Sequence, residues 1–172
     1  KMNRITLGVS SFVVALFAMI FTVTASAAGS INVSKSAEFA VPADKLWETV
    51  KAFEGLHTWH PAVEKTDMKK GVGSKVGNVR LLTLGGGGGV ITETLMRYSA
   101  SGKKMTYSID DSPLPVRSYV STIAVKPTAT GGSKITWSST FKAKPGAKDA
   151  DAKKTIEGVY EAGFENLKKV LA

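Results

Sequence analysis

The chain has 172 residues, no cysteine and a formal net charge of +9. This length is typical of one domain, and a chain without cysteine forms no disulfide and no cysteine-ligated metal site. The lysines are scattered or occur in short pairs, and no nucleic-acid-binding motif accompanies them. We therefore expect a solvated basic surface and no nucleic-acid partner.

The first 27 residues are predicted to be a signal peptide. Lys1 and Arg4 form a basic start, residues 5–23 are uncharged and largely apolar, and Ala25-Ser26-Ala27 fits a small-x-small cleavage site. The alternative is an uncleaved anchor, because this apolar stretch approaches the ~20 residues that span a bilayer. Cleavage after Ala27 would leave residues 28–172 as one domain with a net charge of +7. Export without cysteine indicates the bacterial periplasm, with membrane contact only through the leader before cleavage.

The elements that follow predict a small sheet protein. Residues 31–41 alternate imperfectly and predict a strand. Pro42 opens an amphipathic helix over residues 43–52, and a short helical turn is expected at 56–59. Short apolar runs bounded by turn residues then predict an antiparallel meander of six strands, at residues 62–69, 75–84, 90–99, 104–109, 118–126 and 133–142.

Residues 150–172 predict one long helix, since apolar side chains recur at every third or fourth position. Asp149 or Asp151 is expected to cap its start. Gly158 and Gly163 each cost about 1 kcal/mol relative to alanine within a helix. Such glycines allow another surface to approach closely or leave room for a ligand.

The predicted fold class is therefore α+β, with a highly curved antiparallel sheet of about seven strands gripping a long C-terminal helix. Such a sheet cannot fill its concave side with its own side chains, so we expect a cavity between the sheet and the helix.

The order and spacing of several short motifs resemble the SRPBCC family, the START-like and Bet v 1-like helix-grip proteins that include polyketide cyclases, dehydrases and lipid-transport proteins. The resemblance covers nearly all of residues 28–172 and implies the same helix-grip fold. The motifs are Val41-Pro42-Ala43 with Leu46-Trp47, Trp59-His60-Pro61-Ala62-Val63, Gly77-Asn78-Val79-Arg80, Thr92-Glu93-Thr94-Leu95, and Tyr119 with Ser121.

Alternation with period two places Ile91, Glu93 and Leu95 on one face of their strand. The resemblance implies that this face and its counterparts point into a largely apolar cavity, as is usual for a small-molecule site. The candidate ligand-binding residues are Trp59, Arg80, Leu82, Leu84, Glu93, Tyr107, Ile109, Tyr119, Ser121, Phe141, Ala162 and Asn166.

Two loops are expected at the cavity mouth. By resemblance to the plant abscisic-acid receptors of the family, one corresponds to a gate and the other to a latch. The gate differs from that of the receptors, because five glycines offer no side chain to a ligand. The gate residues are Gly85, Gly86, Gly87, Gly88 and Gly89, and the latch residues are Ser112, Pro113, Leu114 and Pro115.

Glu93 is the best single candidate for acid–base chemistry, because an apolar cavity raises the pKa of a carboxyl group. A nearby Arg80 would oppose this rise, which favours a hydrogen-bonding anchor over a catalyst. The competing interpretation is a structural ion pair between the two. His57 and His60 could share a metal with Glu54 or Glu64, but we expect no metal and no cofactor, with Trp59 at the cavity rim and His60 in a turn.

We therefore expect a non-enzymatic binder of a small hydrophobic or amphipathic molecule, with no catalytic residue. The run SPLPVRSYVSTI and the exported context resemble family members that assist periplasmic methanol oxidation, which implies a periplasmic dehydrogenase and its cytochrome as partners. The alternative is a cyclase or dehydratase using Glu93, Tyr107 or Tyr119. A third hypothesis is an interaction module with a vestigial cavity.

Overall fold

The computed structural model describes residues 29–172, so the predicted signal peptide lies outside the described residues. In the part that is described, no helix combines the length and the apolar character needed to cross a membrane.

Seven strands form one antiparallel sheet in the order β1-β7-β6-β5-β4-β3-β2. Strands β2 to β7 pair consecutively, and β1 joins the sheet beside β7. The strands are β1 (Ile31–Phe39), β2 (Val63–Lys70), β3 (Val79–Leu84), β4 (Val90–Ser99), β5 (Lys104–Asp111), β6 (Val116–Pro127) and β7 (Ser133–Ala143).

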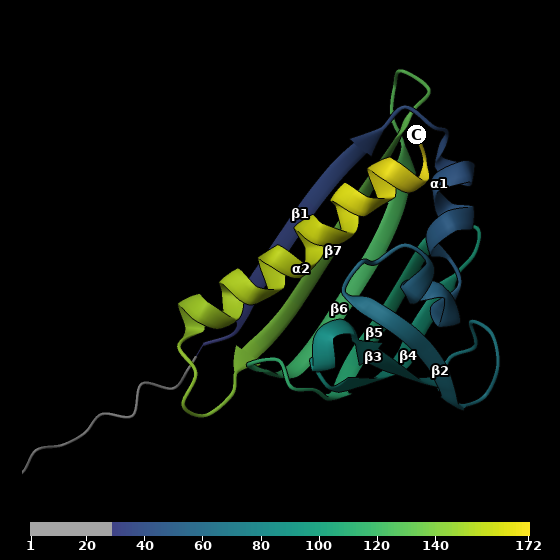
Figure 1. Cartoon of the computed structure of the whole chain (residues 1–172). Coiled ribbons are helices and arrows are strands. Elements are labelled where there is room, and N and C mark those ends of the chain that lie inside the picture. The colour runs from purple at the N-terminus through teal and green to yellow at the C-terminus, as the bar shows by residue number, and fades with distance from the viewer. Residues whose placement is uncertain (1–28) are drawn as a thin grey trace, which may run out of the picture.

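Two short helices, α1 (Ala43–Val50) and the 3-10 helix η1 (Phe53–Thr58), connect β1 to β2. The 3-10 turn η2 (Gly85–Gly87) lies between β3 and β4, and the long helix α2 (Asp149–Val170) ends the chain. Figure 1 shows α2 lying across the sheet along β1 and β7, while η1 and β2 lie at the other end of the curved sheet. The predicted α+β helix-grip fold is confirmed.

Strand β3 begins at Val79, four residues later than predicted, because the preceding loop folds around one side chain. Asn78 Nδ2 donates to the carbonyl oxygens of Val72 and Gly73 at 2.9 and 2.7 Å. Gly71 has a φ of +75°, and a Cβ there would collide with Asn78. Residues 71–78 are therefore a loop that satisfies its own backbone rather than part of a strand.

Helix α2 covers the predicted stretch, but neither aspartate caps it. Its N-cap position is Lys148, which makes no side-chain capping hydrogen bond. The two glycines of this helix differ. Gly158 is exposed with open space beside it, whereas a Cβ on Gly163 would lie 2.9 Å from His60 Cδ2 and 3.0 Å from Trp137 Cζ3. Gly163 therefore allows the helix to approach the sheet closely. Close approach is one of the two roles that the sequence predicted for these glycines.

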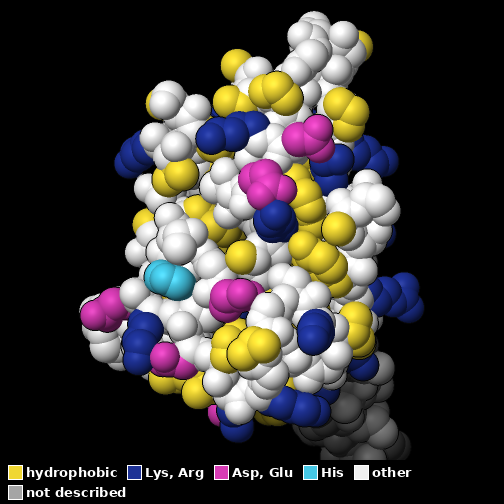
Figure 2. Space-filling model, turned by 90° about the vertical axis from the view of Figure 1, so that its right-hand side faces the viewer, with side chains coloured by type: hydrophobic (Ala, Val, Ile, Leu, Met, Phe, Trp, Pro, Cys, Tyr) yellow, Lys and Arg dark blue, Asp and Glu magenta, His cyan; other side chains and the backbone are white. Residues whose placement is uncertain are grey.

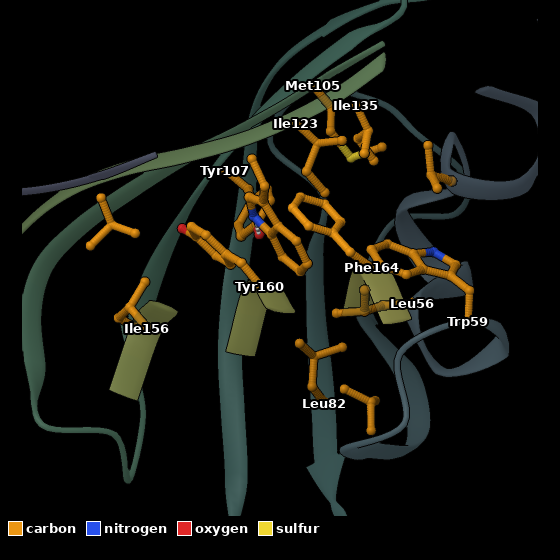
Figure 3. Packing of buried hydrophobic residues seen from close by; sticks show 14 of the residues in the cluster. Leu56, Trp59, Leu82, Met105, Tyr107, Ile123, Ile135, Ile156, Tyr160 and Phe164 are labelled. Carbon is orange, nitrogen blue, oxygen red and sulfur yellow. Dashed lines mark hydrogen bonds between the residues drawn. The ribbon is translucent and has the colours of Figure 1, made fainter. Parts of the chain in front are cut away.

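An aromatic cluster joins α2 to the sheet. The rings of Trp137 on β7 and Tyr160 on α2 stack with centroids 4.4 Å apart, and Trp59 packs against Trp137 at 5.6 Å. In Figure 3, Tyr160 and Phe164 of α2 lie among buried side chains from the sheet and from the η1 segment. This cluster packs α2 onto the sheet, and within it Trp137 also faces the space that the sheet leaves open.

Candidate ligand-binding cavity

A cavity of about 120 Å³ lies on the concave side of the sheet. Strands β2 to β7, the η1 segment and the N-terminal half of α2 all contribute to its wall. Because the sheet curves away from α2 at this end, side chains of neither element fill the space between them. Its lining is apolar except for a few polar groups, which belong to His60, Glu93, Tyr107, Tyr119 and Trp137.

Six of the predicted ligand-binding residues line the cavity, and all of them lie on the strand faces that the family resemblance implied to point inward. Leu114 of the predicted latch also lines it. The six are Leu82, Leu84, Glu93, Tyr107, Ile109 and Tyr119.

Four other predicted residues are buried beside the cavity rather than on its wall. Trp59, expected at the rim, is only 1% exposed and packs against both His60 and Trp137. Phe141 packs on Tyr119 with ring centroids 5.7 Å apart. Arg80 and Ser121 form hydrogen bonds behind the wall.

The two residues predicted on α2 do not line the cavity. Ala162 is only partly buried, and Asn166 Nδ2 donates to the Trp59 carbonyl at 3.0 Å. Instead Ile156 and Val159 reach the cavity from this helix. The periodic pattern predicted the buried stripe of α2, to which Ile156 and Val159 belong. The pattern does not tell which turn of the helix faces the open end of the sheet.

Sequence reasoning also left out residues that precede β2 or begin it. Leu56, His60, Ala62 and Val63 line the cavity, together with Ile91 and Trp137 of the sheet. Ile91 shares the inward face of Glu93, so the alternation alone could have added it. Trp137 shares a face of β7 with the predicted Phe141, so alternation could have added it as well. The residues before and at the start of β2 depend on how the η1 segment folds back onto the sheet.

The predicted gate and latch loops lie next to each other. The Gly85 amide donates to the Ala62 carbonyl at 3.1 Å, and a Cβ on Gly89 would lie 3.4 Å from Pro113 Cγ. Lys144 Nζ donates to the Ser112 carbonyl, which ties the latch to the end of β7. None of the five glycines lines the cavity, whereas Leu84 and Leu114 beside them do.

Glu93 forms a buried ion pair with Arg80 on the neighbouring strand. Arg80 Nε and Nη2 both donate to Glu93 Oε2, at 2.7 and 2.6 Å, and the two side chains are 2% and 5% exposed. Arg80 Nη1 also donates to the Phe53 carbonyl, so the pair fixes η1 to the sheet. Burial raises the pKa of Glu93, and the Arg80 guanidinium opposes this rise. Glu93 is therefore at once a cavity-lining residue and half of a structural ion pair.

A hydrogen-bonded chain of hydroxyl groups runs behind the cavity. Tyr119 Oη and Tyr160 Oη are 2.6 Å apart, and Tyr160 Oη lies 3.2 Å from Ser121 Oγ. Ser121 Oγ donates to the Ser138 carbonyl at 3.0 Å. Burial raises the pKa of Tyr119 and of Tyr107 well above the ordinary value, so both phenols stay protonated at neutral pH.

His60 is held as a neutral ring by two backbone groups. Its Nε2 donates to the Val159 carbonyl at 2.9 Å, and its Nδ1 accepts from the Ala62 amide at 3.3 Å. Burial lowers the pKa of His60, and the nearby Arg80 charge lowers it further, against the opposing effect of the Val159 carbonyl. His60 therefore lines the cavity as a neutral group and holds α2 against the start of β2.

This burial predicts a pH dependence of stability. The unfolded His60 has an ordinary pKa of about 6.5, while the folded one is lower, so the stability is present above pH 6.5 and is lost as the pH falls below it. Urea titrations between pH 7 and pH 5 measure how the free energy of unfolding changes with pH. In the His60→Gln protein this free energy should fall less steeply on acidification than in the native chain, by up to about 1.4 kcal/mol per pH unit.

The exposed His57 provides the matched control, because His57→Gln makes the same substitution at the surface and leaves the buried His60 in place. Glu93 is present in both variants, so its titration cancels in the comparison. A His60→Gln protein with the native slope would show that His60 titrates as freely in the folded state as in the unfolded chain.

The histidines do not share a metal site in the described part of the chain. His57 is exposed and His60 is buried, and no three side chains of histidine, aspartate or glutamate gather there as metal ligands would. Both nitrogens of His60 already have partners.

The surface carries charges of both signs. Figure 2 shows lysine and arginine side chains interspersed with acidic ones on the face it presents, rather than gathered in one patch. Several lysines have acidic neighbours, among them Lys35 with Glu161 at 2.7 Å and Lys103 with Asp44 at 2.8 Å.

Similar solved structures share this architecture. One is the protein XoxI from Bacillus cereus, with 29% identity and a TM-score of 0.74, covering 81% of this chain and 94% of that one. An uncharacterised protein from Bacillus thuringiensis has the same identity and TM-score, covering 82% and 98%. A protein from Nitrosospira multiformis has 22% identity and a TM-score of 0.71, covering 83% and 97%, and indicates the fold alone.

No curated protein matches the chain. The family model described as polyketide cyclase / dehydrase and lipid transport matches residues 30–172, which is the whole helix-grip domain with its cavity. The chain therefore belongs to the polyketide cyclase / dehydrase and lipid transport family.

Proposed function

We propose that the protein binds a small apolar or amphipathic molecule in the cavity and does not transform it. The observation that carries this proposal is an apolar cavity of about 120 Å³ with a few polar groups on its wall. An engineered protein cavity of about 150 Å³ binds benzene. The space is therefore suited to a molecule of about one ring.

The alternative is a cyclase or dehydratase that uses Glu93, Tyr107 or Tyr119 as acid and base. Glu93 is already paired with Arg80, and both nitrogens of His60 have backbone partners. Burial raises the pKa of Tyr107 and Tyr119 well above the ordinary value, so neither phenol is a ready base. A free general base beside a free general acid is what such chemistry needs, and these contacts favour binding instead.

We further propose that the protein is exported to the periplasm and serves an oxidation system there, as the methanol-oxidation accessory protein MxaD does. The run SPLPVRSYVSTI, which resembles that protein, begins at the latch and continues into β6. The partners would be a periplasmic methanol dehydrogenase and its cytochrome. A net charge of +7 over residues 28–172 would speed association with an acidic partner.

Native mass spectrometry of the protein purified from the periplasm of its own host tests the binding proposal. A reproducible extra mass that disappears on denaturation is expected. Purification from the periplasmic fraction also tests export, because a chain that retains residues 1–27 would give a correspondingly larger mass. A bare mass in repeated preparations would contradict the binding function and leave the accessory role, which pull-downs against periplasmic dehydrogenases would then test.

A further inference from the structure

Glu93 has an oxygen that the ion pair does not use. Arg80 Nε and Nη2 both bond to Oε2, and no described residue donates to Oε1. Glu93 lines the cavity, and its Oε1 is not among the polar atoms that are sealed off without a partner, such as Trp59 Nε1. The cavity wall therefore presents a carboxylate oxygen that can accept a hydrogen bond.

Tyr107 has the complementary capacity. Its Oη accepts a hydrogen bond from Trp137 Nε1 at 2.9 Å. The nearby Ser121 Oγ already donates to the Ser138 carbonyl and accepts from Tyr160 and Trp137, so it is not available to take the Tyr107 O–H proton. Each phenol can donate one hydrogen bond in addition to accepting. Tyr107 lines the cavity, so it can donate to a molecule bound there.

Tyr119, the other phenol on the wall, is not free in this way. Ser121 donates to the Ser138 carbonyl, so Ser121 Oγ must accept from Tyr160. Tyr160 has then used its proton, and Tyr119 must donate to Tyr160 Oη. The proton of Tyr119 is therefore engaged inside the protein.

The two available groups lie near each other on the same concave face. Glu93 is paired with Ile109 across strands β4 and β5, and Tyr107 is paired with Leu95. Residues two positions from a direct pair are diagonal neighbours on one face of a sheet. Arg80 does not reach the wall, and both nitrogens of His60 are occupied, so the lining offers no cation to a ligand.

We propose that the ligand is a neutral molecule with one hydroxyl group on an apolar body of about one ring, an alcohol or a phenol. Its O–H donates to Glu93 Oε1, and its oxygen accepts from the Tyr107 hydroxyl. A carboxylate or phosphate head is excluded, because it would face the Glu93 carboxylate without a compensating cation. This inference rests on the proposed binding function and specifies the chemistry of its ligand.

Three probes of similar size test this: phenol, toluene and benzoate. Binding is followed by two-dimensional ¹H–¹⁵N NMR, in which the indole N–H of Trp137 reports from the cavity wall. Phenol should bind about tenfold more tightly than toluene, since a hydrogen bond to a charged group is worth about that factor. Benzoate should not bind at concentrations that saturate the protein with phenol.

Two phenylalanine substitutions form a matched pair. Tyr107→Phe should weaken phenol binding several-fold and leave toluene binding unchanged, and Trp137 Nε1 would keep Ser121 Oγ as a partner at 3.0 Å. Tyr119→Phe removes a hydroxyl whose proton is already engaged and should leave the preference for phenol intact. The double variant Arg80→Met with Glu93→Leu should bind toluene and lose the preference for phenol.

The outcomes separate the two proposals. Equal affinities for phenol and toluene, or binding of benzoate as tight as that of phenol, would overturn the hydroxyl inference while leaving the binding function in place. The same applies if Tyr107→Phe and Tyr119→Phe behave alike. Failure of all three probes to shift the Trp137 signal would overturn both the inference and the one-ring cavity function on which it rests.

Discussion

Replacing Glu93 with glutamine is expected to lower the free energy of unfolding by about 3–5 kcal/mol. Arg80 is 2% exposed and would remain as a buried cation without a counter-charge. An arginine cannot escape this cost by losing its proton. Urea denaturation at pH 7 measures the loss, and it is a large share of the roughly 5–15 kcal/mol that stabilise a typical domain.

The reverse substitution, Arg80→Met, should cost less at low pH than at neutral pH. The remaining Glu93 can take up a proton, since burial raises its pKa and Arg80 would no longer oppose the rise. The stability that the protonated Glu93 contributes to the Arg80→Met protein is therefore present below the ordinary glutamate pKa. It is lost as the pH rises through the raised pKa of Glu93 in the folded protein.

Two controls distinguish a buried charge from ordinary packing. The double variant Arg80→Met with Glu93→Leu should recover most of the loss expected for Glu93→Gln, because apolar pairs often replace buried ion pairs without loss. The remaining cost should be about 1–3 kcal/mol, since the Phe53 carbonyl loses its Arg80 donor. Asp44 forms an ion pair with Lys103, and its side chain is 87% exposed. Asp44→Asn should therefore lower the free energy of unfolding by no more than about 1 kcal/mol. A Glu93→Gln protein that loses as little as Asp44→Asn would contradict the structural role of the pair.

The fold and the strand faces of the site could be predicted because they depend on local patterns. Alternation grouped the residues of each strand by face, the family resemblance implied which face points inward, and Leu82, Glu93 and Tyr107 of that face line the cavity. A period of two is a property of each strand alone, so it needs no knowledge of the rest of the chain.

The remaining parts of the wall depend on how distant segments meet. His60 precedes β2 in the sequence, yet its ring bonds the Val159 carbonyl of α2, 99 residues later. Asn166 was predicted to face the cavity, but its amide bonds the Trp59 carbonyl. Helical periodicity identifies the buried stripe of α2, whereas the choice between Val159 and Asn166 as a wall residue follows from where η1 docks.

That docking makes Val159 the most informative position for changing the cavity itself. Val159 is half-buried on α2 and lines the cavity. In Val159→Phe, the added ring atoms should occupy the open space rather than displace packed neighbours, so the stability should change by less than the 1–3 kcal/mol typical of overpacking. The bound mass should disappear from native mass spectra, and the affinity for toluene should fall at least tenfold.

Val170→Phe is the matched control, since this residue lies on the same helix, is 47% exposed and does not line the cavity. It adds the same ring to the surface and should bind the ligand as the native protein does. Loss of the bound mass in Val159→Phe alone would place the ligand between α2 and the sheet. If both variants kept it, the molecule would bind elsewhere on the protein, and the cavity would have no part in its function.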